Sequence, residues 1–214
     1  MTTPVLFGAA YSVYTRICRL AFAEKGVTYR FEEVDVFGPG GAPETQLRRQ
    51  PFGKIPAFEH DGFTLYETGA ITRYIDEVFA GPPLQPAGPQ ARSRLNQAIS
   101  ILDAYAYPHW VWGLFVERVR KPQRAAAADE AKVAAALPVA KTCCEALANI
   151  LRDQPFLCGE DLSLADLHAA PMLACLAMTE EGKGMIAVRP AFAAWWERLR
   201  LRPGMAETRA VTED

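Results

Sequence analysis

The fold is decided by QPFGKIPAFEHDGFTLYETGAITRYI, residues 50–75. Residues 55–60 and 64–65 are short strand-like runs, and the Asp-Gly dipeptide between them suits a hairpin turn. These runs predict two antiparallel strands. From Glu67 onward, apolar residues recur at helical spacing until Gly81 ends the pattern. The stretch therefore predicts a strand, a second strand and a helix.

The segment upstream predicts a βαβ unit. Residues 4–8, PVLFG, form a short apolar run, and apolar residues at helical spacing follow from Val13 until Gly26 supplies a stop. Residues 29–36 are rich in aromatic and β-branched side chains, which favour a strand. Two strands joined through a helix pair in parallel. The expected order is β-α-β followed by β-β-α.

This α/β pattern ends at a composition break. Residues 80–90, AGPPLQPAGPQ, contain prolines and glycines that disfavour regular structure. The strand-like runs also stop there. We therefore expect an α/β domain over residues 1–80, a linker over residues 81–90 and an all-α domain over residues 91–214.

Helical periodicity continues through the second domain. Pro108 lies inside the first apolar stripe and predicts a long helix that is kinked or broken. Pro138 lies inside the second stripe and favours a late helix start. Ser163 opens the best-defined helix, because Ser163 and Asp166 can cap each other. The predicted helices cover residues 95–119, 133–151, 163–178 and 190–201.

Charge and cysteine content exclude several classes of function. The chain has 23 Lys and Arg against 25 Asp and Glu, so no basic field favours nucleic acid. It has neither a basic leader before an apolar stretch nor an apolar run of about 18 residues, so we expect a cytoplasmic protein without a membrane partner. The 5 cysteines include no C-x-x-C pair and no Cys/His cluster, which predicts free thiols and no metal.

Several segments resemble the cytosolic glutathione transferases. Residues 50–75 are similar to the glutathione-binding segment of the plant phi class and its bacterial relatives. Residues 7–29 resemble the N-terminal strand and helix, and the signature Ser-x-x-Thr-Arg stands at Ser12, Thr15 and Arg16. The later segments LCGEDLSLADL and RPAFAAWWERLRLRPGM also resemble this family. The chain is thus identified as a phi-like, serine-type glutathione S-transferase.

This resemblance implies a fold and an activity. It implies a thioredoxin-like N-terminal domain with a four-stranded mixed sheet, followed by an all-α bundle that contributes the second-substrate pocket. It also implies a homodimer that uses glutathione as co-substrate and conjugates the glutathione thiolate to small hydrophobic electrophiles. Two alternatives stay open, namely a glutathione-dependent peroxidase and a non-catalytic ligand-binding or interaction protein with the same fold.

Ser12 is the predicted catalytic residue. It stands where the first strand hands over to the first helix, and the positive end of a helix dipole stabilises a thiolate there. An ordinary helix cap is the alternative role for Ser12. The hydroxyls of Tyr11 and Tyr14 are further candidates for thiolate stabilisation, with pocket lining as their alternative. Cys18 lies further along the helix, and we interpret it as a small buried hydrophobic residue.

The resemblance assigns the glutathione peptide to five further positions. Ile55 precedes a predicted cis Pro56 and presents its backbone to the extended peptide, as an added strand would. Glu67 and Thr68 open a helix, where they suit the γ-glutamyl ammonium and carboxylate. Lys54 suits the glycyl carboxylate. Phi-class relatives often place another basic residue upstream, but the chain reads GPGGAPE in that region.

Aromatic residues beside Pro108 predict the second-substrate pocket, because flat apolar electrophiles bind aromatic surfaces. Aromatic packing between the domains is the alternative for each of them. The predicted pocket residues are Tyr11, Tyr105, His109, Trp110 and Trp112, with Tyr107 and Phe115 nearby.

The predicted dimer has two candidate contact faces. One lies on the helix after Glu67, with Arg73, Tyr74 and Asp76 around its apolar stripe. The other lies on the first helix of the second domain, where Asp103 is either a solvated carboxylate or a group that reaches the partner's glutathione.

Overall fold

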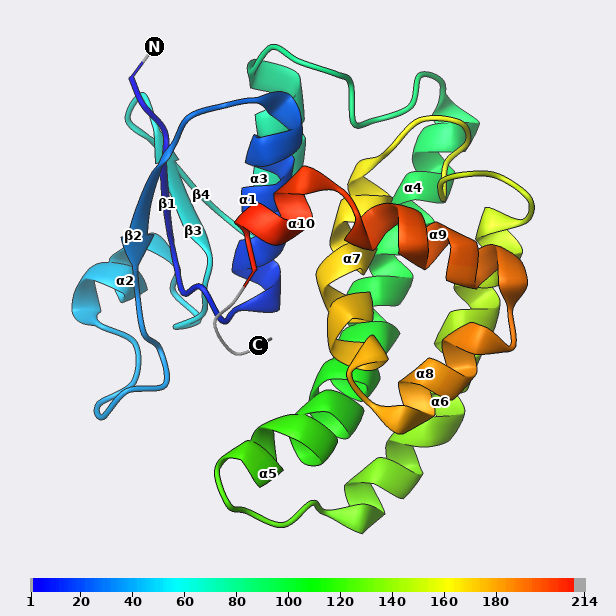
Figure 1. The fold of residues 1–214 in the computed structure, drawn as a ribbon. Helices are drawn as coiled ribbons and strands as arrows, with labels where there is room; N and C mark the ends of the chain where they lie inside the picture. Colours follow the sequence, from blue (N-terminus) through cyan, green and yellow to red (C-terminus); the bar gives the residue numbers. More distant parts are fainter. Residues whose placement is uncertain (1, 210–214) are drawn as a thin grey trace. The chain divides into compact units, whose positions relative to one another are not determined.

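The computed structural model describes residues 2–209, which belong to two compact units (Figure 1). Unit 1 comprises Met1–Pro83 and Pro203–Asp214, and unit 2 comprises Leu84–Arg202. The predicted boundaries differ from these units at two places. A helix begins at Pro89, inside the expected linker, and the chain from Pro203 onward joins the α/β unit instead of the helical one.

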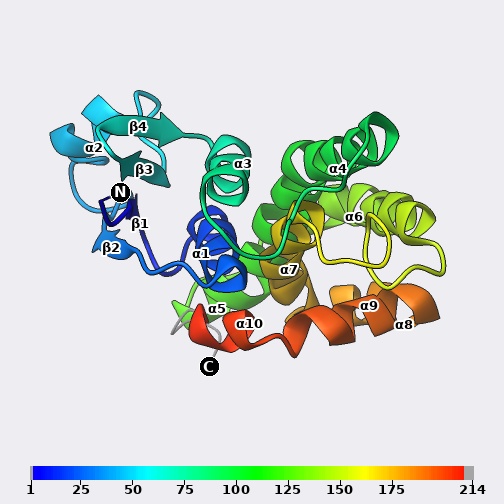
Figure 2. The ribbon, with the colours of Figure 1, turned by 90° about the horizontal axis from the view of Figure 1, so that it is seen from above.

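Unit 1 has the predicted four-stranded mixed sheet, in the order β2-β1-β3-β4. Strand β1 pairs parallel with β2 and antiparallel with β3, which pairs antiparallel with β4. Helices α1 and α3 cover one face of the sheet, and α2 lies on the other (Figure 2). The elements are β1 (Val5–Gly8), α1 (Val13–Lys25), β2 (Arg30–Glu33), α2 (Glu44–Arg49), β3 (Ala57–His60), β4 (Phe63–Tyr66), α3 (Thr68–Val78) and α10 (Pro203–Glu207).

Helix α1 is fixed at both ends by its sequence. Ser12 caps its start, and Gly26 ends it with φ 65°, a conformation that glycine adopts without steric cost. Its apolar side is fully buried against the sheet and α3. Lys25, in its last turn, forms a buried ion pair with Asp76 of α3 at 3.1 Å. Breaking such a pair leaves an uncompensated charge, so this pair ties α1 firmly to α3.

Arg16 explains why the C-terminal segment belongs to unit 1. Its guanidinium is buried and donates hydrogen bonds to the Met205 carbonyl at 2.9 Å and to the Thr208 hydroxyl at 3.3 Å. A buried arginine needs such acceptors, because an unpaired buried charge is costly. These contacts hold α10 against α1. The hydrophobic periodicity of the sequence did not predict this packing.

Unit 2 is the predicted helical bundle (Figure 1). Helix α7 is its core, since nearly all of its residues are buried and it contacts α4, η1, α8 and α9. The reciprocal cap between Ser163 and Asp166 is present, as predicted. The elements are α4 (Pro89–Ile101), η1 (Leu102–Arg120), α5 (Lys121–Gln123), α6 (Glu130–Leu151), α7 (Leu164–Ala177), α8 (Glu180–Ala187) and α9 (Pro190–Arg200).

Helices η1 and α6 continue through the two prolines that the sequence analysis singled out. Helix α4 continues directly into η1, which has π-type winding and contains Pro108. The wider winding accommodates a residue that lacks an N–H and crowds the preceding turn. Helix α6 begins at Glu130 and runs through Pro138, so the expected late start was wrong. The reason is a cap, because the Asp129 carboxylate accepts hydrogen bonds from the first N–H groups of α6.

Among residues 2–209, α6 is also the one helix long and apolar enough to cross a membrane. Length and composition are the only grounds for this. The core helix of a soluble protein passes the same test, so one such helix is weak evidence of a membrane span.

Candidate glutathione site

The strand register brings three loops to one end of the sheet. Phe7, near the C-terminal end of β1, pairs with Ala57 at the start of β3, and Ala57 pairs with Tyr66 at the end of β4. The turn after β1, the turn before β3 and the turn after β4 are therefore neighbours. These turns carry Ser12, Lys54, Ile55, Pro56, Glu67 and Thr68, which are the predicted catalytic and glutathione-binding residues.

Ser12 is half-buried at the start of α1, with φ −79° and ψ 122°. Its Oγ accepts a hydrogen bond from the Thr15 N–H at 3.2 Å. No acceptor for the Ser12 hydroxyl proton is found among the described residues. The cap and the thiolate-stabilising role are therefore compatible, because the same hydroxyl accepts from the helix and can donate outward.

The Tyr11 hydroxyl would have to donate to a bound thiolate in order to stabilise it, but it already has another acceptor. Its hydroxyl donates to Asp35 Oδ1 at 3.0 Å. Burial, followed by the Asp35 carboxylate, raises the pKa of Tyr11 to about 12. The hydroxyl thus stays protonated and committed to Asp35, which argues against Tyr11 as the activating group.

The Ile55–Pro56 peptide bond is cis, as predicted. No hydrogen bond to the Ile55 N–H or C=O is found within the part of the chain that the structure describes, so both groups are available to a ligand. The preceding main chain is held by side chains of α2, with Gln46 Nε2 donating to the Lys54 carbonyl at 2.8 Å and the Lys54 N–H donating to Gln50 Oε1 at 2.9 Å. The Lys54 residue itself is exposed.

Glu67 has an unusual backbone conformation. Its φ of 68° and ψ of 115° lie in a region that non-glycine residues rarely adopt, at a cost of about 1–3 kcal/mol. Such strain is concentrated at functional sites. Thr68 follows as the first residue of α3 and is 94% buried, and no side chain within residues 2–209 caps this helix. The first N–H groups of α3 are therefore free to bind an anion.

Cys18 lies within α1. The Cys18 side chain is fully buried, and this burial raises the pKa of its thiol strongly. The thiol stays protonated, so Cys18 is not a nucleophile. This agrees with its interpretation as a small buried residue.

The predicted second-substrate residues separate into two groups. Trp110 is fully buried and donates from Nε1 to the Ala140 carbonyl at 3.1 Å, so it belongs to the core of unit 2 and the pocket assignment was wrong. Its size and indole N–H suit a core position that offers an acceptor. Tyr105 and Trp112 remain exposed, and His109 Nδ1 lies 2.6 Å from the Tyr105 carbonyl.

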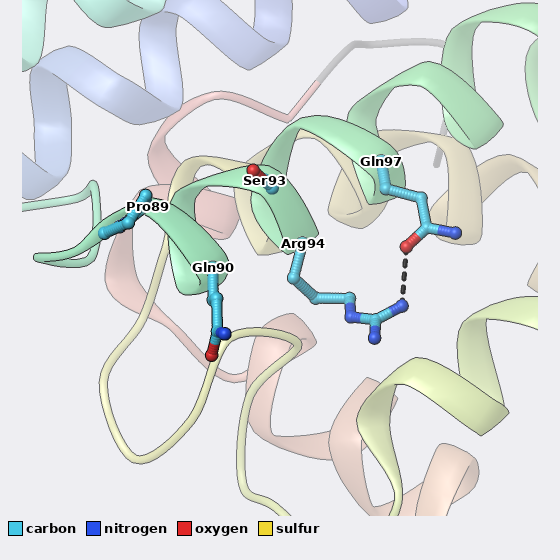
Figure 3. Close-up of a pocket in the computed structure, with 5 residues that line it drawn as sticks. All are labelled: Pro89, Gln90, Ser93, Arg94 and Gln97. Atoms are coloured by element: carbon cyan, nitrogen blue, oxygen red, sulfur yellow. Dashed lines mark hydrogen bonds between the residues drawn. The ribbon is translucent and has the colours of Figure 1, made fainter.

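Two surface hollows lie elsewhere. One of about 450 Å³ follows α4, where Arg94 is hydrogen-bonded to Gln97 at 2.6 Å (Figure 3). The other, of about 310 Å³, lies at the opposite end of the sheet, beside the turn at Asp61-Gly62. Neither is lined by a predicted site residue. Within residues 2–209, no group of three or more His, Cys, Asp or Glu side chains could hold a metal ion.

Comparison with known proteins identifies the family. Residues 6–83 match the model of the glutathione S-transferase N-terminal domain, and residues 93–203 match that of the C-terminal domain. The chain belongs to the glutathione S-transferase family. Glutathione S-transferase F14 of Arabidopsis thaliana is 30% identical over 190 residues, covering 86% of this chain and 74% of the relative. The phi-like family assignment and the two-domain transferase fold are thus confirmed.

Two further relatives of this transferase are informative. The structure of glutathione S-transferase III in apo form superimposes with a TM-score of 0.85 at 28% identity, covering 97% of this chain and 95% of that one. The stringent starvation protein A homolog of Pasteurella multocida (strain Pm70) is 29% identical over 196 residues, covering 90% of this chain and 85% of the relative.

Some features of the transferase's site were not predicted from the sequence. They are the Asp35 acceptor for Tyr11, the strained backbone at Glu67, and the clamp on Lys54 by Gln46 and Gln50. The i, i+4 spacing of the two glutamines was the one available signal. It lies in a helix too short to give a periodic apolar pattern.

Proposed function

We propose that this transferase binds glutathione at the end of the sheet where Ser12, Ile55 and Thr68 are neighbours, and conjugates its thiolate to small hydrophobic electrophiles. The observation that carries the proposal is the shared location of three unsatisfied groups. These are an outward hydroxyl at the start of α1, an unpaired backbone before a cis proline, and an uncapped start of α3.

Ser12 would act by stabilising the thiolate. A free thiol has a pKa near 8.5, so it is mostly protonated at neutral pH. Lowering this pKa by about two units requires roughly 2.7 kcal/mol of preferential stabilisation of the charged form. A hydrogen bond to a charged group contributes about 1.5–3 kcal/mol. One bond donated by the Ser12 hydroxyl therefore supplies most of the requirement, and the α1 dipole adds to it.

The peptide would bind as an added strand. The Ile55 N–H and C=O would pair with the cysteinyl unit, as an edge strand pairs with an extended ligand. The Thr68 hydroxyl and the first N–H groups of α3 would hold the γ-glutamyl carboxylate, and the Glu67 carboxylate would face its ammonium. Lys54 would meet the glycyl carboxylate. Tyr11, Tyr105, His109 and Trp112 remain candidates for the electrophile's pocket.

Thr68→Ala should weaken glutathione binding more than it slows the reaction. The bond from Thr68 anchors the substrate in the ground state and the transition state alike, so its loss raises KM by about tenfold with little change in kcat. Steady-state kinetics with varied glutathione measure both constants. A large fall in kcat at saturating glutathione, with KM unchanged, would contradict the anchoring role.

Retention on immobilised glutathione, followed by a panel of electrophiles and an organic hydroperoxide, tests the function as a whole. Conjugation of the electrophiles supports the proposal. Reduction of the hydroperoxide alone would favour the peroxidase alternative, although serine at position 12 gives no thiol for transfer chemistry. Binding without turnover would favour a ligand-binding or interaction protein, and one relative carries a name that is not that of a transferase.

We further propose a cytoplasmic homodimer. The side chains on α3 constrain the interface, because Asp76 is paired with Lys25 and the Tyr74 hydroxyl lies 3.0 Å from His60 Nδ1. These two groups therefore contribute little to a partner contact. Sedimentation should report about 47 kDa, twice the 23.6 kDa of one chain. A fully active 23.6 kDa species would overturn the dimer and any role of Asp103 across it.

A further inference from the structure

Helix α2 carries two buried glutamines on an otherwise largely exposed helix. Gln46 is fully buried and Gln50, its C-terminal cap residue, is 98% buried. Gln50 follows the last turn of α2 with an extended backbone, and both side chains reach the loop that precedes Pro56.

The two side chains hold both polar groups of one residue. Gln46 Nε2 donates to the Lys54 carbonyl at 2.8 Å, and Gln50 Oε1 accepts from the Lys54 N–H at 2.9 Å. Both bonds have ordinary lengths and are partly buried, and a hydrogen bond is stronger where water is partly excluded. The main chain at Lys54 is therefore clamped from one helix.

This clamp determines where the next backbone group points. The Lys54 carbonyl and the Ile55 N–H belong to the same planar peptide group, and in a trans peptide they point in opposite directions. Fixing the Lys54 oxygen therefore fixes the direction of the Ile55 N–H. That N–H is the group that the proposed peptide site uses.

Helix α2 is itself attached to the sheet. The Arg49 guanidinium bonds to the Glu59 carboxylate of β3 at 2.8 Å and lies over the Phe7 ring of β1, 3.8 Å from its centroid. Figure 2 shows α2 on the sheet face opposite α1 and α3. The helix that holds Lys54 is therefore attached to β1 and β3, and β1 also leads into Ser12.

Packing alone does not explain the glutamine at position 46. Its Oε1 is buried and has no hydrogen-bond partner among residues 2–209. An unsatisfied buried acceptor is unfavourable, and an apolar side chain of the same shape would fill the space without that penalty.

We propose that Gln46 and Gln50 are positioning residues for glutathione, which orient the Lys54–Ile55 peptide group for pairing with the bound peptide. The proposal rests on the proposed function and deepens it. Neither glutamine is required to touch glutathione, and both act through the backbone of Ile55.

The test compares variants of similar shape in the full-length protein. Gln46→Met removes the donor, so KM for glutathione should rise about fivefold while kcat stays within about twofold, and the midpoint of thermal unfolding should not fall. Gln50→Glu keeps an acceptor for the Lys54 N–H and should bind glutathione nearly as wild type does. Gln46→Glu places an acceptor against a carbonyl and should bind more weakly. Thr45→Val, on the exposed side of α2, is the matched control.

Calorimetric titration with glutathione gives the same ranking without turnover. Equal effects of Gln46→Glu and Gln50→Glu, or a loss of thermal stability in Gln46→Met without a change in glutathione affinity, would show a packing role and overturn the inference. Thr68→Ala distinguishes failure of the proposed glutathione site from failure of the inference about the two glutamines. If Thr68→Ala weakens binding and Gln46→Met does not, the inference alone fails; if neither does, the proposed site fails with it.

Discussion

Ser12→Ala should lower kcat/KM for conjugation by about 10²-fold and raise the pKa of bound glutathione by about two units, toward 8.5. The physical reason is the loss of a hydroxyl proton that has no acceptor within residues 2–209 and that stands at the positive end of α1. Titration of the thiolate absorbance of the binary complex measures the pKa directly. Because a raised pKa keeps the thiol protonated, the lost rate should recover as pH rises through 8.5.

Two variants control for indirect effects. Ser12→Thr keeps both the cap and the hydroxyl and should retain most of the activity. Tyr11→Phe removes the neighbouring hydroxyl, which is committed to Asp35, so the thiol pKa should not change. Ser12→Cys should form a mixed disulfide with oxidised glutathione if the thiol lies beside this position. An unchanged thiol pKa in Ser12→Ala would eliminate Ser12 as the activator.

Asp166→Ala should destabilise the helical unit by about 3–5 kcal/mol, which is among the larger effects of a single substitution. The carboxylate is fully buried and accepts four hydrogen bonds. Oδ1 accepts from the Leu157 N–H at 2.9 Å and Trp195 Nε1 at 2.8 Å, and Oδ2 accepts from the Ser163 N–H at 2.9 Å and the Ser163 hydroxyl at 2.6 Å. Alanine leaves these donors buried without partners. Urea unfolding followed by tryptophan fluorescence measures the loss.

Asp166→Asn distinguishes the network from simple packing. Burial raises the pKa of the Asp166 carboxyl, while the hydrogen bonds from Leu157, Ser163 and Trp195 oppose that rise. Asparagine keeps the volume but turns an N–H donor toward one set of donors, so it should also destabilise the fold. Asp161→Ala, at an exposed position nearby, should change stability by less than about 0.5 kcal/mol. A stable Asp166→Asn variant would show that packing, not the network, determines this site.

The local sequence determined the strands and most of the longer helices of this protein. The Asp-Gly turn, the stop at Gly26 and the reciprocal cap at Ser163 act within a few residues, so the sequence predicts them directly. The order of strands and helices then leaves few sheet topologies. Ser12 and Thr68 became site candidates through the family resemblance, because a helix start by itself indicates only a cap.

The tertiary structure decided what depends on contacts between distant segments. Trp110 lies in a run of aromatic residues, and the sequence does not show which of them are buried. Only packing against α6 made Trp110 a core residue. Pro138 lies within α6 because a cap at Asp129 extends the helix beyond the start that the proline suggested. Gln46 lies in a six-residue helix with no periodic signal, Gln50 follows its end, and their partner is a backbone group whose position follows from the sheet. Local rules fix which conformation a segment adopts, whereas hydrogen-bond partners far apart in the chain are fixed only when the strands take their register.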